Sequence, residues 1–100
     1  MSKSILQDKR ECYITGYTGD LARHHVYGGG RRQLSEKWGC WVYLRPDFHN
    51  MADYGVHGIR GHLLDLELKR ICQRRFEALY GHEKFMEVFK KNYLEEEDAE

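Results

Sequence analysis

The chain has 100 residues, 41% of them hydrophobic, which fits one small domain and excludes a multidomain enzyme. It contains no signal-peptide core and no apolar run near the roughly 20 residues that cross a bilayer, so we expect a soluble, cytoplasmic protein without membrane contact. Its three widely spaced cysteines exclude a disulfide framework, and its formal net charge is zero.

The zero net charge hides an uneven distribution along the chain. Residues 95–100 hold five acids, so residues 1–94 carry sixteen bases against eleven acids. We divide the chain into a flexible polar N-terminus (1–10), one domain (11–94) and an acidic tail (95–100). Such a tail is typical of a solvated end. The alternative is a tail that folds over the basic body and competes with phosphate.

Short strands and helical turns are predicted for the first half. Residues 12–16 (CYITG), 21–27 (LARHHVY) and 40–44 (CWVYL) are rich in β-branched and aromatic residues and are bounded by glycine or proline, as strands are. Residues 31–38 are predicted to form about two helical turns. A further helix is predicted to begin over 47–52, where an aspartate that follows proline can cap it.

Two helices are predicted for the second half. After Gly61, apolar residues recur at three- and four-residue spacing over nearly twenty residues: Leu64, Leu68, Ile71, Cys72, Phe76 and Leu79. Gly81 stands where this helix is expected to end. A second helix then carries Phe85, Met86, Phe89 and Tyr93 on one side. The predicted class is α+β, with two packed helices behind a small irregular sheet.

Histidines concentrate in the middle of the chain, where four of six fall within residues 24–57. Adjacent strand residues point to opposite faces, so His24 and His25 are expected to have different tasks, one binding a metal and the other facing a substrate. His49 follows the predicted strand 40–44, and His57 comes eight residues later. This order of strands, histidines and helical segment is that of a ββα-metal hairpin.

Residues 12–94 resemble small phage-borne HNH-family proteins related to the recombination enhancement function nuclease. The matching stretches are CYITG (12–16), HHVYGG (24–29), RRQLSEKWG (31–39), VYLRPDFH (42–49), GVH (55–57) and FEALYGHEKFMEVFKKNYL (76–94). The resemblance implies a ββα-metal, HNH-like hairpin–helix core with two packed C-terminal helices. It also implies metal-dependent endonuclease cleavage of nucleic acid, chiefly DNA, in phage or prophage DNA processing or recombination within a bacterial host.

The resemblance assigns a role to each central histidine. His24 and His49 become metal ligands, and His57 a third ligand or a substrate contact. His25 becomes the general base, because a neutral imidazole can take a proton from water near neutral pH. One divalent ion is expected, with Mg²⁺, Mn²⁺, Zn²⁺ and Ni²⁺ all open. The oligomeric state is open as well.

Phosphate contacts are expected from arginines and glycines near these histidines. Guanidinium groups bind phosphate in a bidentate way, and the candidates are Arg31, Arg32 and Arg45. A glycine run lets the backbone approach an anion closely, as Gly28, Gly29 and Gly30 would allow. The plainer interpretation is a solvated helix start for the arginine pair 31–32 and a mobile loop for the glycines.

The chain departs from the family pattern in two places. The first cysteine pair is reduced to Cys12 and Thr15, and the second is replaced by Arg45 and Phe48, so no structural zinc is expected. The asparagine that orients the base also has no counterpart, and we expect a backbone carbonyl near Cys40 to replace it. Two alternatives to an active nuclease therefore remain: a degenerate nucleic-acid-binding module, and a protein-binding inhibitor or accessory factor.

Overall fold

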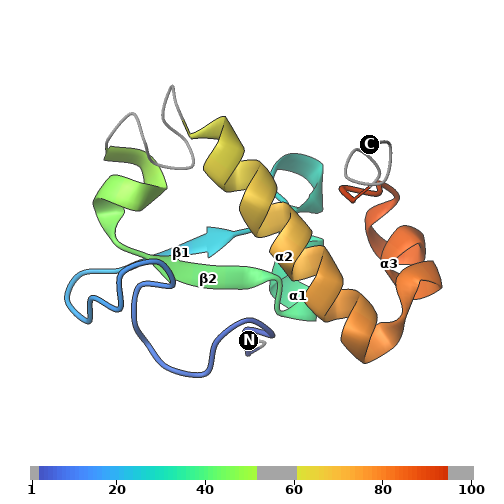
Figure 1. Ribbon diagram of the computed structural model, residues 1–100, viewed down its shortest axis with the longest axis horizontal. Coiled ribbons are helices and arrows are strands. Elements are labelled where there is room, and N and C mark those ends of the chain that lie inside the picture. The colour runs from blue at the N-terminus through green and yellow to red at the C-terminus, as the bar shows by residue number, and fades with distance from the viewer. Residues whose placement is uncertain (1–2, 52–60, 95–100) are drawn as a thin grey trace.

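The computed structural model describes residues 3–51 and 61–94 (Figure 1). The elements, in chain order, are β1 (Ala22–His25), the 3₁₀ turn η1 (Gly29–Arg31), α1 (Arg32–Trp38), β2 (Trp41–Leu44), the short helix η2 (Asp47–Met51), α2 (His62–Tyr80) and α3 (His82–Phe89). This arrangement confirms the predicted α+β class. His57 and the acidic tail lie outside the described residues. Among the described helices, none is both long and apolar enough to cross a membrane.

The two strands form an antiparallel hairpin in which Ala22 pairs with Leu44 and His25 with Trp41. Because side chains alternate along a strand and paired residues share a face, the hairpin has two distinct faces. What we call the outer face carries Arg23, His25, Trp41 and Tyr43. The core face carries His24, Val42 and Leu44, all buried.

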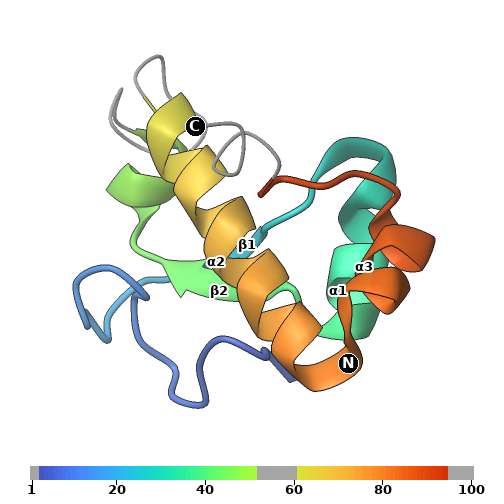
Figure 2. The ribbon, with the colours of Figure 1, turned by 45° about the vertical axis from the view of Figure 1, so that its right-hand side comes forward.

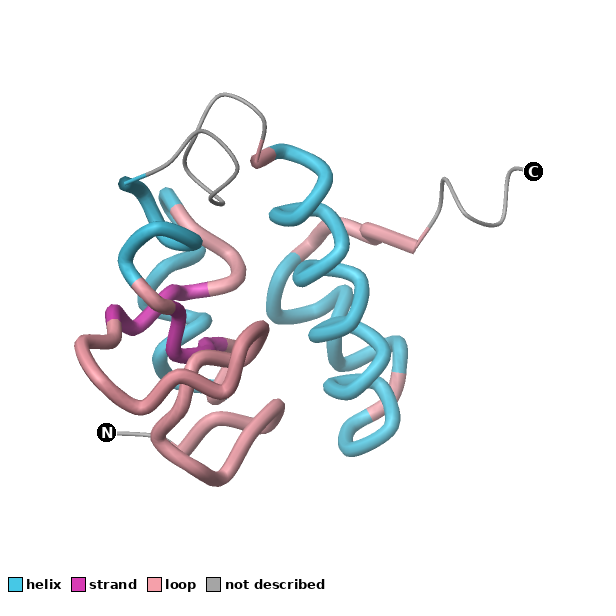
Figure 3. The backbone as a smooth tube through the Cα atoms, turned by 60° about the vertical axis from the view of Figure 1, so that its left-hand side comes forward, coloured by secondary structure: helices cyan, strands magenta, loops and turns pink. Residues whose placement is uncertain are grey.

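The core lies between the hairpin and the two C-terminal helices, with α2 crossing the hairpin (Figures 1 and 2). Figure 3 shows the strands on one side of the molecule and α2 with α3 on the other. Phe76 of α2 joins the layers, because its ring lies 5.5 Å from Phe85 and 5.5 Å from Trp38 (ring centroids). Tyr27, just after β1, contacts Phe89 of α3 at 4.5 Å. Aromatic packing of this kind stabilises a small core well.

The residues of the predicted apolar stripe on α2 lie partly in the core and partly at the surface. Leu68, Cys72 and Phe76 are buried in the core, as the spacing predicts. Leu79 is 45% exposed, so the last residue of the predicted stripe does not reach the core. Together with Ile71 it lines a surface cavity against the N-terminal segment instead. Residues 71 and 79 are eight apart and share a helix face that is turned toward the N-terminal segment.

Residues 12–16 were predicted to form a strand, and this prediction is wrong. The N–H of Gly16 donates to the carbonyl of Cys12, and the N–H of Cys12 donates to the carbonyl of Tyr17, both at 2.8 Å. These bonds close a tight turn, and Gly16 supplies the positive φ of 79°. These local bonds use backbone groups that an extended strand would offer to a neighbour. Among the described residues, the one backbone bond from this turn to β2 runs from the N–H of Tyr13 to the carbonyl of Tyr43 at 2.8 Å.

Residues 3–10 lie against the hairpin, whereas their polar composition predicted a flexible stretch. The hydroxyl of Ser4 donates to the carbonyl of Trp41 at 2.5 Å, and the N–H of Ile5 donates to the carbonyl of Gly39 at 2.9 Å. The side-chain carbonyl of Gln7 accepts from the N–H of Tyr43 at 2.7 Å. Ile5 and Leu6 also pack against the core, but two apolar residues among polar ones do not form the periodic signal of a packed element.

Gly39→Ala is expected to destabilise the protein more than Gly29→Ala. Both glycines have positive φ, 75° and 58°, so alanine costs about 1–2 kcal/mol at either position. A Cβ at Gly39 would also lie 2.3 Å from the carbonyl oxygen of Lys3, whereas nothing lies within 4 Å of one at Gly29. Urea unfolding of the two variants measures the difference. Equal losses would show that the N-terminal segment does not pack on Gly39.

Candidate active site

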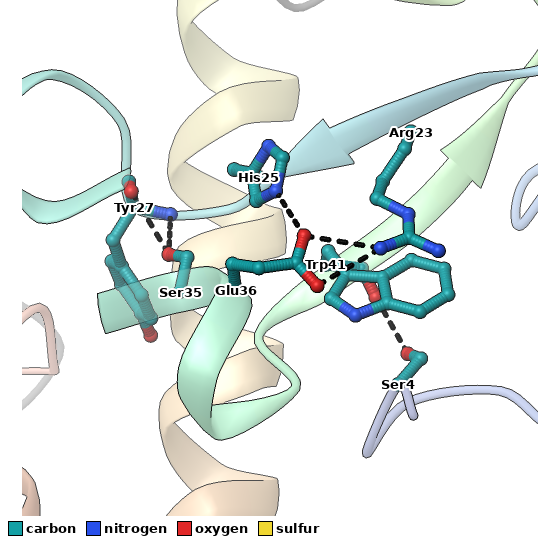
Figure 4. Close-up of polar contacts among 7 residues, drawn as sticks. All are labelled: Ser4, Arg23, His25, Tyr27, Ser35, Glu36 and Trp41. Carbon is teal, nitrogen blue, oxygen red and sulfur yellow. Dashed lines mark hydrogen bonds and ion pairs between the residues drawn. The ribbon is translucent and has the colours of Figure 1, made fainter. Parts of the chain in front are cut away.

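His25 and Glu36 form a hydrogen-bonded pair at the end of the outer face (Figure 4). The Nε2 atom of His25 lies 2.8 Å from Oε1 of Glu36, and Nη1 of Arg23 donates to both carboxylate oxygens at 2.9 and 3.0 Å. The strand places residues 23 and 25 on one face because they are two apart, and α1 presents Glu36 to both. A cationic and an imidazole side chain thus share one carboxylate.

This arrangement keeps Glu36 ionised and fixes the proton on His25. The hydrogen bond from His25 holds the pKa of the Glu36 carboxyl below its usual value, and Arg23 adds to this effect against the opposing influence of partial burial. An ionised carboxylate only accepts hydrogen bonds, so it requires a proton on Nε2 of His25. The Nδ1 atom is then the ring nitrogen that can accept a proton from water.

A surface cavity of about 220 Å³ opens beside this pair. Its lining residues are His25, Arg32, Gln33 and Glu36. Arg32 and Gln33 are exposed and come from the first turn of α1. The cavity therefore presents one oriented imidazole and one solvent-accessible guanidinium to a ligand.

His24 and His49 meet on the other side of β1. Their ring centroids lie 5.4 Å apart with an interplanar angle of 68°. Two imidazoles that bind one tetrahedral ion through metal–nitrogen bonds of about 2.0–2.1 Å place their ring centroids roughly 5 Å apart. The observed distance is close to this value, and it is also that of an edge-to-face ring contact. His24 is 2% exposed and His49 is half-buried.

The position of His49 follows from the turn that ends β2. The N–H groups of Phe48 and His49 both donate to the carbonyl of Arg45, at 2.9 and 3.1 Å. This turn starts η2 and directs the His49 ring back to β1. The region 3–51 and 61–94 contains no group of three or more histidine, cysteine or acidic side chains around one point. The third predicted ligand, His57, lies outside these ranges.

Two of the three arginines predicted to bind phosphate have partners within the protein. The Nε of Arg31 donates to the carbonyl of Phe89 at 2.8 Å. Arg45 donates to both carboxylate oxygens of Asp47, at 2.7 and 2.6 Å. Arg32 is the exposed member of the set and lines the cavity beside His25. The glycines Gly28, Gly29 and Gly30 are exposed at the start of η1, where the N–H of Arg31 donates to the carbonyl of Gly28 at 3.0 Å.

The resemblance compares four positions with zinc-binding cysteines, of which Cys12 keeps the cysteine and Thr15, Arg45 and Phe48 do not. Cys12 accepts hydrogen bonds from the Thr15 side chain and from the backbone N–H of Arg45. Burial acts to raise the pKa of the Cys12 thiol, but these hydrogen bonds outweigh it and lower the pKa below its usual value. The Arg45 guanidinium lies 5.6 Å from the centroid of the Phe48 ring. The hydrogen bond between Cys12 and the backbone of Arg45 thus joins the two segments.

Sequence reasoning did not identify Glu36 as part of the site. It placed residue 36 on a helix but expected a backbone carbonyl near Cys40 to orient His25. The carbonyl of Cys40 instead accepts from the N–H of Val26 at 2.9 Å, and Nε2 of His25 is bound by Glu36. The only local signal that could have indicated Glu36 as the partner of His25 is that it is an acid on the helix that follows the histidine pair.

The site thus consists of a histidine–carboxylate pair on one side of β1 and a histidine pair on the other. All the residues that form it belong to β1, α1 and η2. Comparisons with protein-family models, with curated proteins and with solved structures find no match for this chain, so the function is inferred from these residues.

Proposed function

We propose that this protein is a metal-dependent endonuclease with an HNH-like, ββα-metal site that hydrolyses phosphodiester bonds in DNA. The observation that carries the proposal is the division of the histidines. His24 and His49 lie 5.4 Å apart (ring centroids), as two ligands of one ion would, and His25 has a carboxylate partner of its own. Hydrolysis of a phosphodiester needs both a cation and a proton acceptor. The resemblance of residues 12–94 to phage-borne HNH-family proteins supports DNA as the substrate.

The residues of this chain suggest the following sequence of events. Nδ1 of His25 takes a proton from a water molecule, and the resulting hydroxide attacks phosphorus. The bond from phosphorus to the leaving oxygen then breaks, and that oxygen takes up a proton. Glu36 holds the His25 ring in place and stabilises the imidazolium that forms. Arg32 binds a non-bridging phosphate oxygen from the rim of the cavity.

The two imidazole nitrogens of His24 and His49 suit a metal ion of borderline hardness. Imidazole nitrogen favours Zn²⁺ or Ni²⁺, whereas Mg²⁺ and Mn²⁺ prefer oxygen ligands. A divalent ion held by these two residues would polarise the scissile phosphate and neutralise the charge that develops on it.

The two halves of the site are adjacent along β1 although they face opposite ways. Consecutive Cα atoms are about 3.8 Å apart, but His24 is 2% exposed on the core face, so the phosphate would contact His25 directly and reach the ion of His24 and His49 only around the edge of the strand. In the described part of the chain, β1 pairs with β2 alone, which leaves its second edge without a strand partner. We place the scissile phosphate at this edge.

Incubation of the purified protein with plasmid DNA tests the proposal. We expect cleavage with at least one of Mn²⁺, Mg²⁺, Zn²⁺ and Ni²⁺, no cleavage with a chelator, and strongly slowed cleavage by His25→Ala with the metal that supports it. His82→Ala, an exposed histidine of α3, serves as the matched control and should cleave like the wild type. DNA binding without cleavage would instead indicate the degenerate binding module. The absence of any DNA binding would indicate the inhibitor or accessory factor.

A further inference from the structure

We infer that the protein binds a single nucleic-acid strand in the cavity between its N-terminal segment and the outer face of the hairpin. The inference rests on the proposed function, which makes the neighbouring His25 part of an active site. It adds that the substrate of that site is single-stranded. The cavity measures about 440 Å³. This volume lies within the range of about 300–1,000 Å³ that is typical of small-ligand sites, so it has room for one nucleoside.

The rim of the cavity is cationic. Lys3, Lys9 and Arg10 line it from the N-terminal segment, and all three side chains are exposed. None of them forms an ion pair with a described residue, and Asp8 is the acid among the lining residues. Exposed cations that lack acidic partners are suited to the phosphates of a nucleic-acid backbone.

The floor of the cavity is aromatic. Trp41 and Tyr43 both line it, with ring centroids 5.1 Å apart in an edge-to-face arrangement. The guanidinium of Arg23 covers the Trp41 ring at 3.8 Å, and that of Arg10 lies 5.6 Å from the Tyr43 ring centroid. Trp41 is only 5% exposed beneath this guanidinium, so the surfaces on which a base can stack are the Arg23 guanidinium and the Tyr43 ring. In a duplex each base is stacked between its neighbours, so this floor favours an unpaired strand.

Arg23 connects the cavity to the candidate active site. Its side chain lines the cavity over Trp41 and also donates to Glu36, the partner of His25 (Figure 4). His25 and Trp41 are paired directly across the hairpin. A strand whose base lies on this floor therefore extends toward His25. The cations of this cavity would make the phosphate contacts that the sequence predicted for Arg31 and Arg45. Those two arginines have partners within the protein.

Fluorescence anisotropy with a labelled oligothymidylate, an oligouridylate and a DNA duplex of the same length tests this inference. All titrations contain a chelator, so binding is measured without cleavage. We expect the wild type to bind the single strands more tightly than the duplex. Lys9→Glu/Arg10→Glu should lower single-strand affinity by at least about 10-fold and reduce the salt slope of log affinity by about 1.4, which corresponds to two phosphate contacts. Tyr43→Leu should lower affinity by about 5-fold or more.

Matched variants separate a binding site from a general effect of charge. Lys90→Glu/Lys91→Glu makes the same charge change after α3, on the other side of the molecule from residues 9 and 10 (Figures 1 and 2), and should have a much smaller effect. Tyr17→Leu, in an exposed turn outside the cavity, is the control for Tyr43. Lys9→Gln/Arg10→Gln repeats the test with a milder change if the reversed charges lower the melting temperature.

Equal losses in the two lysine-containing double variants, or duplex binding as tight as single-strand binding, would overturn the inference. So would wild-type affinity in Tyr43→Leu. These results do not depend on catalysis. A wild type that fails to cut plasmid DNA yet binds single strands through residues 9, 10 and 43 would refute the proposed function and support this site.

Discussion

Replacing His25 with alanine is expected to slow phosphodiester cleavage by about 10²–10⁴-fold, the usual contribution of a general base. The affinity for a divalent ion should change little, because His25 faces Glu36 on the outer face and His24 meets His49 on the other. Single-turnover cleavage of a labelled substrate measures the first quantity. Calorimetric titration with the metal that supports cleavage measures the second.

His24→Ala is the informative comparison for this prediction. It removes one of the paired imidazoles, so it should weaken both metal affinity and cleavage. Loss of metal affinity to the same extent in His25→Ala and His24→Ala would contradict the division of roles between the two neighbours. Because His24 is buried at 2% exposure whereas His25 is not buried, melting curves of both variants in a chelator are measured to separate loss of the metal from loss of stability.

Glu36→Gln separates the orientation of His25 from its presence. A neutral amide can donate as well as accept, so it no longer requires the proton of His25 to reside on Nε2. We expect a lower rate of cleavage at unchanged metal affinity, with a smaller loss than in His25→Ala. The chain offers a matched control in the pair of exposed His82 and half-buried Glu77, whose Nδ1 and Oε2 atoms are 2.6 Å apart. Glu77→Gln should therefore leave cleavage unchanged.

The regular helices could be predicted from the sequence because their signals are local. The heptad-like spacing of α2 and the glycine at its end predict a helix close to the observed His62–Tyr80. The prediction for 31–38 likewise agrees with Arg32–Trp38. Residues 12–16 have the composition of a strand, but hydrogen bonds within the turn determine their structure. Tyr93 is buried although α3 ends at Phe89, because its backbone N–H bonds to Gln73 of α2.

The only part of the candidate site that could be predicted is the part that follows from the alternation of side chains along a strand. Alternation alone indicates that His24 and His25 face opposite ways, and the structure has them so. The pairing of His25 with Glu36 depends on how α1 packs against β1, which no local pattern encodes. The same holds for Arg31, whose partner is the carbonyl of Phe89, 58 residues further along the chain. The basic residues at 3, 9 and 10 were overlooked because their segment reads as a loose end.

His49→Ala is expected to abolish the stabilisation that a divalent ion gives to the folded protein. An ion that binds only the folded state at 100 times its dissociation constant stabilises it by about 2.7 kcal/mol. For a domain of this size that corresponds to a rise in melting temperature of about 10–20 °C. The ion needs imidazoles from both β1 and η2, so the loss of either ring should remove most of this rise. Melting curves with Zn²⁺, Ni²⁺ or Mn²⁺, against a chelator, measure the effect.

His62→Ala provides the control, because His62 is exposed in the first turn of α2. His62→Ala should keep the full metal-dependent rise in melting temperature. Binding of ions to histidines of the unfolded chain would reduce this rise in every variant, and His62→Ala would then show the reduction as well. His24→Ala should match His49→Ala, since a shared ion loses the same bond from either side. If His49→Ala were stabilised by the ion as much as the wild type, the 5.4 Å approach of the two rings would be a packing contact and not a pair of ligands. Catalysis would then have to draw its cation from residues other than this pair.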